Sequence, residues 1–150
     1  MEIASAVASL SESYPASPDS IPRARIALSS FAAEAGASAE QQEQVRLVVS
    51  EAVTNAVQHA YGGGPGDVHV TAMVVSGELW ILVADDGLGL CAGGDSPGLG
   101  LGLAWMAQFS DGMTLVARAC GGVEVRLRFD LRRAGAMGAY DSAARVAGVC

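Results

Sequence analysis

The sequence has no lysine, and arginine supplies all 9 of its basic residues, against 16 acidic ones. The formal net charge is -7. Proteins that bind nucleic acid carry a basic patch that neutralises phosphates. Proteins held at anionic membrane surfaces carry clusters of Lys or Arg. Because the chain has neither feature, we expect no direct contact with nucleic acid and none with a membrane.

Cysteine and long apolar runs are also scarce. The three cysteines, Cys91, Cys120 and Cys150, are far apart and form no CxxC pair. This spacing argues against a zinc knuckle and against a disulfide framework. No apolar run approaches the ~20 residues that a membrane-spanning helix needs. The acidic start, MEIASAVASLSESYP, lacks the basic n-region of a signal peptide. We therefore expect a cytoplasmic protein with reduced thiols.

The composition is nevertheless that of a folded domain. The chain has 150 residues, of which 51% are hydrophobic and 17% charged. That length and apolar content suffice for one domain with a packed core. The apolar pattern becomes weak and Ala/Gly-rich near the C-terminus. We predict one domain over residues 1–133 and a flexible tail over residues 134–150.

Helical periodicity dominates the first part of the chain. A first helix is predicted to start at Asp19 or Ser20, either of which could cap it. A second helix is predicted to start at Ser38, because Ser38 and Gln41 fit a capping box. Its apolar pattern continues to about Ala60 and stops at a run of glycines. Two consecutive helices are therefore expected before any hairpin.

The apolar period changes to two after these helices. Residues 67–85 alternate as a hairpin that turns at 76–77, and residues 113–131 form a second hairpin that turns at 121–122. A third helix is predicted between them, over residues 101–111. Two hairpins can form one four-stranded sheet, to which an N-terminal strand could be added. We predict an α+β fold, a two-layer sandwich with a mostly antiparallel sheet covered on one face by helices.

Glycine is concentrated in DDGLGLCAGGDSPGLGLGL, residues 85–103. Glycine allows the backbone to approach a ligand closely, and free N–H groups at a helix start bind anions such as phosphate. A flexible linker is the alternative, but a linker does not need a strand ending in Asp85 or a helix beginning at Gly102. The P-loop pattern is absent, since there is no GxxxxGK[ST]. A Rossmann loop is excluded because the segment follows a hairpin.

A polar stripe lies on the second predicted helix. Glu51, Asn55 and His59 are four residues apart, so an α-helix would place them on one face. Their neighbours are mostly valine and alanine, which leaves little room for a solvated side. A solvated surface therefore explains the stripe poorly, and the rest of the chain has to show what the stripe faces. A hydrogen-bonded polar pair is the alternative for Glu51 and Asn55, and simple packing is the alternative for His59.

Three segments resemble the N, G1 and G2 boxes of the histidine-kinase-like ATPases. They are SEAVTNAVQHAY, DDGLGL and GLGLGLAWMAQFSD, in that order. With the lead-in YPASPDSIPRARIALSSFAAEAG, the resemblance covers roughly residues 12–130 and is closest to the bacterial anti-sigma-factor serine kinases. It implies the Bergerat fold, with ATP bound between the sheet and a long flexible lid.

The resemblance also implies a role for each motif residue. Glu51 would be the general base, and Asn55 would be a ligand of Mg²⁺ and bind the nucleotide. His59 would lie near the phosphates or simply pack. Asp85 would accept the exocyclic amine of adenine, whereas Asp86 would be solvated. The glycine loops would contribute further nucleotide-binding positions: Gly87, Gly89, Gly98, Gly100, Leu101 and Gly102.

The resemblance implies an ATP-dependent serine/threonine protein kinase that uses Mg²⁺. It would phosphorylate an antagonist protein, sequester a sigma factor, or do both, as a monomer or a homodimer. One departure bears on this function: the lid, LCAGGDSPG, has no Arg or Lys, although phosphoryl transfer needs charge stabilisation. Arg46 could compensate. A nucleotide-controlled binding module with little transfer therefore remains an alternative. A two-component histidine kinase is disfavoured, because no His precedes the second helix.

Overall fold

A computed structural model gives the structure of the chain. It describes residues 8–60, 64–87, 99–119, 121–133 and 146–147. Within these ranges, no helix is long and apolar enough to cross a membrane.

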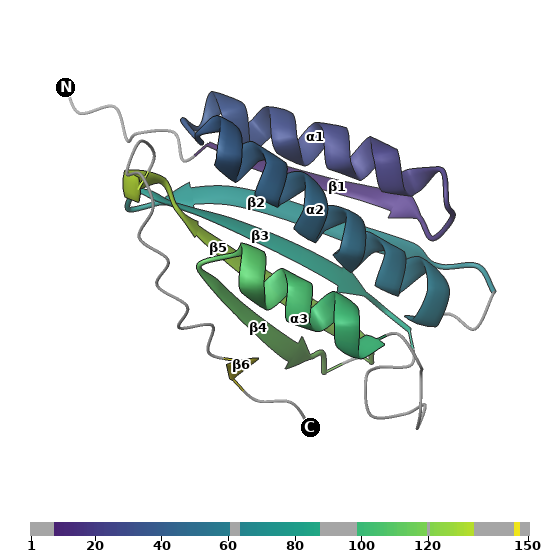
Figure 1. The fold of residues 1–150 in the computed structure, drawn as a ribbon. Coiled ribbons are helices and arrows are strands. Elements are labelled where there is room, and N and C mark those ends of the chain that lie inside the picture. Colours follow the sequence, from purple (N-terminus) through teal and green to yellow (C-terminus); the bar gives the residue numbers. More distant parts are fainter. Residues whose placement is uncertain (1–7, 61–63, 88–98, 120, 134–145, 148–150) are drawn as a thin grey trace.

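One six-stranded sheet forms the first layer (Figure 1), in the order β1-β2-β3-β5-β4-β6. Its strands are β1 (Ser9–Pro15), β2 (Asp67–Val75), β3 (Glu78–Asp85), β4 (Gly112–Ala117), β5 (Val123–Asp130) and β6 (Val146–Ala147). The first five pair antiparallel, and β6 pairs parallel with β4. Both predicted hairpins and the added N-terminal strand are confirmed. The remainder of the predicted tail, 134–145 and 148–150, lies outside the described residues, and its boundary at 133 stays a prediction.

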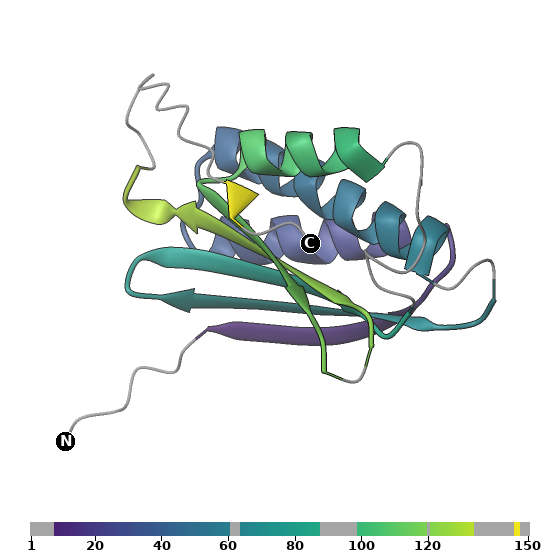
Figure 2. The same cartoon turned by 90° about the horizontal axis from the view of Figure 1, so that it is seen from below.

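Helices form the second layer and cover one face of the sheet (Figure 2). They are α1 (Ser20–Glu34), α2 (Ala39–Asn55), the π-helical turn η1 (Ala56–Ala60) and α3 (Leu99–Phe109), and the 3-10 turn η2 (Leu131–Arg133) follows β5. The predicted α+β sandwich is therefore confirmed. α3 begins two residues before the predicted start at residue 101.

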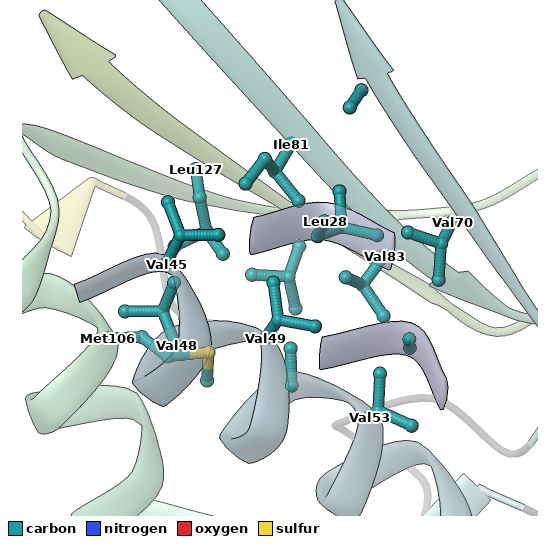
Figure 3. Packing of buried hydrophobic residues seen from close by; sticks show 14 of the residues in the cluster. Leu28, Val45, Val48, Val49, Val53, Val70, Ile81, Val83, Met106 and Leu127 are labelled. Carbon is teal, nitrogen blue, oxygen red and sulfur yellow. The ribbon is translucent and has the colours of Figure 1, made fainter. Parts of the chain in front are cut away.

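Aliphatic side chains between the layers form the core. Val45, Val48, Val49 and Val53 of α2 lie against Ile81, Val83 and Leu127 of the sheet, with Leu28, Val70 and Met106 around them (Figure 3). All ten are at most 3% exposed. Burying such a side chain contributes roughly 1.5–3 kcal/mol. This packing fixes how α2 sits on the sheet, and with it the polar side chains that α2 carries.

The ends of the helices follow the sequence in two cases and depart from it in another. The capping box is confirmed, since Ser38 accepts from the Gln41 backbone while the Gln41 side chain accepts from the Ser38 N–H. Gly36 has φ +97° after α1, a conformation that glycine tolerates best. Asp19 is the N-cap residue of α1 as predicted, but its side chain makes no cap bond, and the Ser20 hydroxyl donates to the Pro15 carbonyl at 2.6 Å.

The second helix does not remain an α-helix to Ala60 as predicted. It is α-helical to Asn55 and then widens into the π-turn η1. Glu51 and Asn55 lie on the α-helical part with the predicted spacing, whereas His59 belongs to the π-turn. Such turns are rare and frequently occur at functional sites. The side chain of His59 lies outside the described residues.

Candidate functional site

The backbone of α3 packs closely against the polar stripe of α2. A Cβ atom built on Gly102 would lie 3.1 Å from Glu51 Oε2, 3.3 Å from Asn55 Nδ2 and 3.5 Å from Asn55 Oδ1. Both polar side chains are half-buried. A glycine inside a helix lowers stability by about 1 kcal/mol relative to alanine. The close approach of Glu51 and Asn55 explains why a glycine occupies position 102. The structure thus brings together three of the predicted site residues, one from the third motif and two from the first.

Asp85 occupies the last position of β3. Strand alternation places it on the face of Leu79, Ile81 and Val83, which is the face that the helices cover. Its partner across the β2 ladder is Val68, which is fully buried. Asp85 is therefore a carboxylate at the edge of the core, on the same side of the sheet as Glu51 and Asn55.

Two backbone donors hold the carboxylate of Asp85. The N–H of Gly87 donates to Asp85 Oδ1 at 3.0 Å, and the N–H of Val123 also donates to this side chain. Burial raises the pKa of Asp85 above its ordinary value, although the two donors and nearby Arg118 oppose that shift. An ionised carboxylate has about four acceptor positions, so two N–H donors leave capacity for another donor.

Asp86 was predicted to be solvated, and its side chain is exposed, but it also has two partners within the chain. Its carboxylate is 51% exposed but lies 2.9 Å from Nε2 of His69 and forms an ion pair with Arg118. The hydrogen bond from His69 and the charge of Arg118 lower the pKa of Asp86. Its His69 partner belongs to the sheet face opposite the helices, since Val68 and Val70 face the core. The contacts of Asp85 and Asp86, although adjacent in sequence, therefore lie on opposite sides of the sheet.

Sequence reasoning missed Arg118 as a residue of this region. Its Nη1 donates to the carbonyl oxygen of Asp85 at 2.9 Å as well as to Asp86. The only sequence signal was its position just before the Gly121-Gly122 turn. Arg46, considered earlier as a compensating cation, pairs instead with Glu43 toward the N-terminus of α2, away from Asn55.

The remaining predicted positions are described in part or not at all. Gly87 is described and forms the turn after β3. Gly100 and Leu101 belong to α3 by their backbone, and His59 belongs to η1. Gly89 and Gly98 lie outside the described residues. Within the described ranges, no group of three or more His, Cys, Asp or Glu residues could hold a metal ion by itself.

We expect the carboxyl group of Asp85 to titrate above the ordinary range for aspartate and that of Asp86 to titrate below it. The physical causes are burial at Asp85 and the His69 and Arg118 contacts at Asp86. An NMR pH titration of the side-chain carboxyl carbons measures both pKa values. The opposite order of the two midpoints would contradict the described contacts.

The same pKa shifts predict opposite effects on stability. A raised folded-state pKa means that ionised Asp85 costs free energy above that pKa, and the cost disappears as pH falls through it. Asp85→Asn should therefore unfold at pH 7 with a free energy close to or above that of the wild type. Asp86→Asn is the matched control. It should be less stable than the wild type at pH 7, and the difference should vanish as pH falls through the lowered pKa of Asp86.

Comparison with known proteins identifies relatives of this chain. The chain is 42% identical over 67 residues to an anti-sigma F factor of Clostridium acetobutylicum, covering 45% of this chain and 47% of that protein. It is 43% identical over 76 residues to the serine-protein kinase RsbW of Bacillus pumilus, covering 49% and 47%. The matched segments thus span about half the length of these curated relatives.

A solved structure shares the fold. It contains the RsbU and RsbW domains of Rv1364c from Mycobacterium tuberculosis, and it matches with a TM-score of 0.64 at 23% identity, over 81% of this chain and 32% of that one. The family description "Histidine kinase-like ATPase domain" matches residues 14–129. This range includes all the site residues described above and most of the sheet. The chain therefore belongs to the family of histidine kinase-like ATPase domains.

Proposed function

We propose that this protein is an ATP-dependent serine/threonine protein kinase of the anti-sigma-factor type. One observation carries the proposal. Gly102, from the glycine-rich third motif, lies directly against Glu51 and Asn55, an acid and an amide that suit proton transfer and metal binding. The kinship with proteins named anti-sigma F factor and serine-protein kinase RsbW supports it.

Asp85 is proposed to recognise the base of the nucleotide. The exocyclic amine of adenine is a donor, and the half-buried carboxylate of Asp85 is an acceptor already fixed by Gly87 and Val123. A fixed acceptor at the margin of the core discriminates well, because a base that presents a carbonyl there would leave both groups unpaired. The glycines at 87, 89, 98, 100 and 102, with Leu101, would let the backbone approach the phosphates.

Asn55 is proposed to hold Mg²⁺ through its side-chain oxygen. Mg²⁺ prefers oxygen ligands and is commonly bound by one or two protein groups together with phosphates and waters. A single amide therefore fits this ion better than an all-protein cage would. When bound, the ion would neutralise charge on the phosphates. His59 is proposed to lie near the phosphates, on the wider turn η1 that follows Asn55.

Glu51 is proposed as the general base for phosphoryl transfer. It would accept the proton of a partner serine hydroxyl as that oxygen bonds to the γ-phosphorus. The bond from phosphorus to the β–γ bridging oxygen breaks, and ADP leaves with the electron pair. Transfer of this kind depends mainly on positioning and on electrostatic stabilisation. The half-buried place of Glu51 against the backbone of α3 would position it.

A second function is a nucleotide-controlled binding module with little transfer. The observation that favours it is the pairing of Arg46 with Glu43 and of Arg118 with Asp86. These two cations are engaged elsewhere, and a basic group at the γ-phosphate would lower the barrier to transfer. In either case the proposed partners are an antagonist protein and a sigma factor in the cytoplasm, with no direct binding of nucleic acid or membrane.

A homodimer is proposed to form through the sheet face opposite the helices. Met73 and Trp80 are cross-strand partners there, and Leu82 follows on the same face of β3. The flanking charges are paired within the chain, Arg126 with Glu124 and Arg128 with Glu78, so this face is nearly neutral. A neutral face with an apolar centre suits packing against its own copy.

We expect Trp80→Glu to convert a dimer into a monomer, because it buries a charge at the centre of the proposed interface. Light scattering over a range of concentrations measures the mass. The control is Trp105→Glu on α3, in the helix layer, where the residue is 47% exposed. That variant should keep the wild-type mass. A monomeric wild type, or equal masses for both variants, would remove the homodimer from the proposal.

We expect Asp85→Asn to weaken ATP binding equally with and without Mg²⁺, since it changes only the acceptor for adenine. Asn55→Ala is the matched variant and should lose affinity mainly when Mg²⁺ is present, because it removes an oxygen ligand of the ion. Calorimetric titration with ATP, with the metal or with EDTA, measures both. Wild-type affinity in Asp85→Asn would refute the base assignment. Metal-independent loss in Asn55→Ala would refute the metal role.

We expect Glu51→Ala to bind ATP normally but to transfer phosphate about 10²–10⁴-fold more slowly, which is the usual contribution of a general base. The assay uses labelled ATP and a panel of candidate antagonist proteins. Asp85→Asn should behave differently, with weaker binding but transfer recovered at saturating ATP. If neither the wild type nor Glu51→Ala labels any partner while both bind ATP, the binding module replaces the kinase.

A further inference from the structure

The β4–β5 hairpin turn lies directly against the end of β3. Gly122 has φ +89°, and a Cβ there would overlap the carbonyl oxygen of Asp85 and lie 2.7 Å from its carbonyl carbon. A Cβ on Gly121 would lie 3.7 Å from the carbonyl oxygen of Gly87. The turn and the segment that carries Asp85 are therefore in backbone contact, with no room for a side chain at Gly122.

Arg118 joins this turn to Asp85. It begins the turn, since its N–H donates to Gly122 O at 3.1 Å and its carbonyl accepts from Gly121 at 3.1 Å. Its guanidinium reaches the carbonyl oxygen of Asp85 at 2.9 Å and the carboxylate of Asp86. The hairpin therefore contacts Asp85 through the Val123 N–H on its carboxylate and through Arg118 on its main chain.

We propose that Arg118 is a positioning residue that sets the base selectivity of the nucleotide site by fixing the main chain of Asp85. The inference rests on the proposed function, because it concerns how the same site selects its base. Arg118 lies 33 positions from Asp85 in the sequence and contacts its carbonyl oxygen rather than its carboxylate. It would act through Asp85 without itself touching the nucleotide.

A chain of polar contacts holds Arg118 in place. Asp86 binds Arg118 with one carboxylate oxygen and His69 with the other. The other ring nitrogen of His69, Nδ1, lies 2.8 Å from the Ser13 hydroxyl. These side chains come from β1, β2, the segment after β3 and the β4–β5 hairpin. Side chains from these four segments therefore meet next to Asp85, on the side of the sheet opposite the helices.

Selectivity depends on how rigidly the acceptor is held. A fixed carboxylate accepts a hydrogen bond from the amine of adenine and repels the carbonyl of hypoxanthine or guanine at the same position. A carboxylate that can turn or withdraw makes a weaker hydrogen bond to the amine of adenine. It also repels the carbonyl of hypoxanthine less. Loosening Asp85 should therefore weaken ATP binding and strengthen inosine triphosphate binding relative to it, which is a change that general destabilisation does not produce.

The test compares Arg118→Met with Arg126→Met. Arg126 lies on the sheet face opposite the helices, is 45% exposed against 35% for Arg118, and pairs with Glu124 at 2.8 Å. Affinities for ATP and inosine triphosphate are measured by calorimetry with Mg²⁺ present. We expect Arg118→Met to lower the ATP preference roughly fivefold, the equivalent of one net hydrogen bond of about 1 kcal/mol. Arg126→Met should keep the wild-type ratio.

A measurement without nucleotide separates this inference from the proposed function. In Arg118→Met, the carboxyl carbon resonance of Asp85 should move and its backbone amide should exchange faster, whereas Arg126→Met should change neither. An unmoved Asp85 resonance, or an unchanged ratio of ATP to inosine triphosphate affinity, overturns the inference. Failure of the wild type to bind either nucleotide, with the Asp85 resonance moved as expected, would refute the proposed function and the selectivity role with it, and would leave only the structural effect of Arg118 on Asp85.

Discussion

The contact between the β4–β5 turn and the end of β3 is the constraint on which the placement of Asp85 depends. Gly122 can take φ +89° and bring its backbone against Asp85 only because it has no side chain. That approach allows Val123 to donate to the carboxylate and Arg118 to reach the carbonyl oxygen. The sheet order makes the contact unavoidable, since β5 pairs with β3 along its length.

The other end of the site depends on a different approach, that of α3 to α2. Gly102 lies against Glu51 and Asn55, which the valines of α2 hold over the sheet. The two ends are thus positioned by separate elements, the hairpin for Asp85 and the helix pair for the acid and the amide.

Local patterns in the sequence predicted much of this architecture. Alternation predicted both hairpins, and Ser38 with Gln41 predicted the start of α2, because these signals involve neighbouring residues. Three motifs also predicted the family. The roles of Arg118 and Asp86 were missed, since their contacts join residues more than thirty positions apart. The π-turn after Asn55 was missed because apolar spacing does not separate an α-turn from a wider one.

Glycine lowers the free energy of unfolding at this site in two different ways. At Gly102 a helix interior loses about 1 kcal/mol relative to alanine, and at Gly122 the unfolded chain gains freedom that folding must remove. Burial of Asp85 adds a third cost, visible in its raised pKa. A chain selected only for stability would fill the helix position and neutralise the acid. Retaining all three keeps α3 close to Glu51 and Asn55 and the hairpin turn close to Asp85, where we propose that the nucleotide binds; this would be the usual trade between stability and activity.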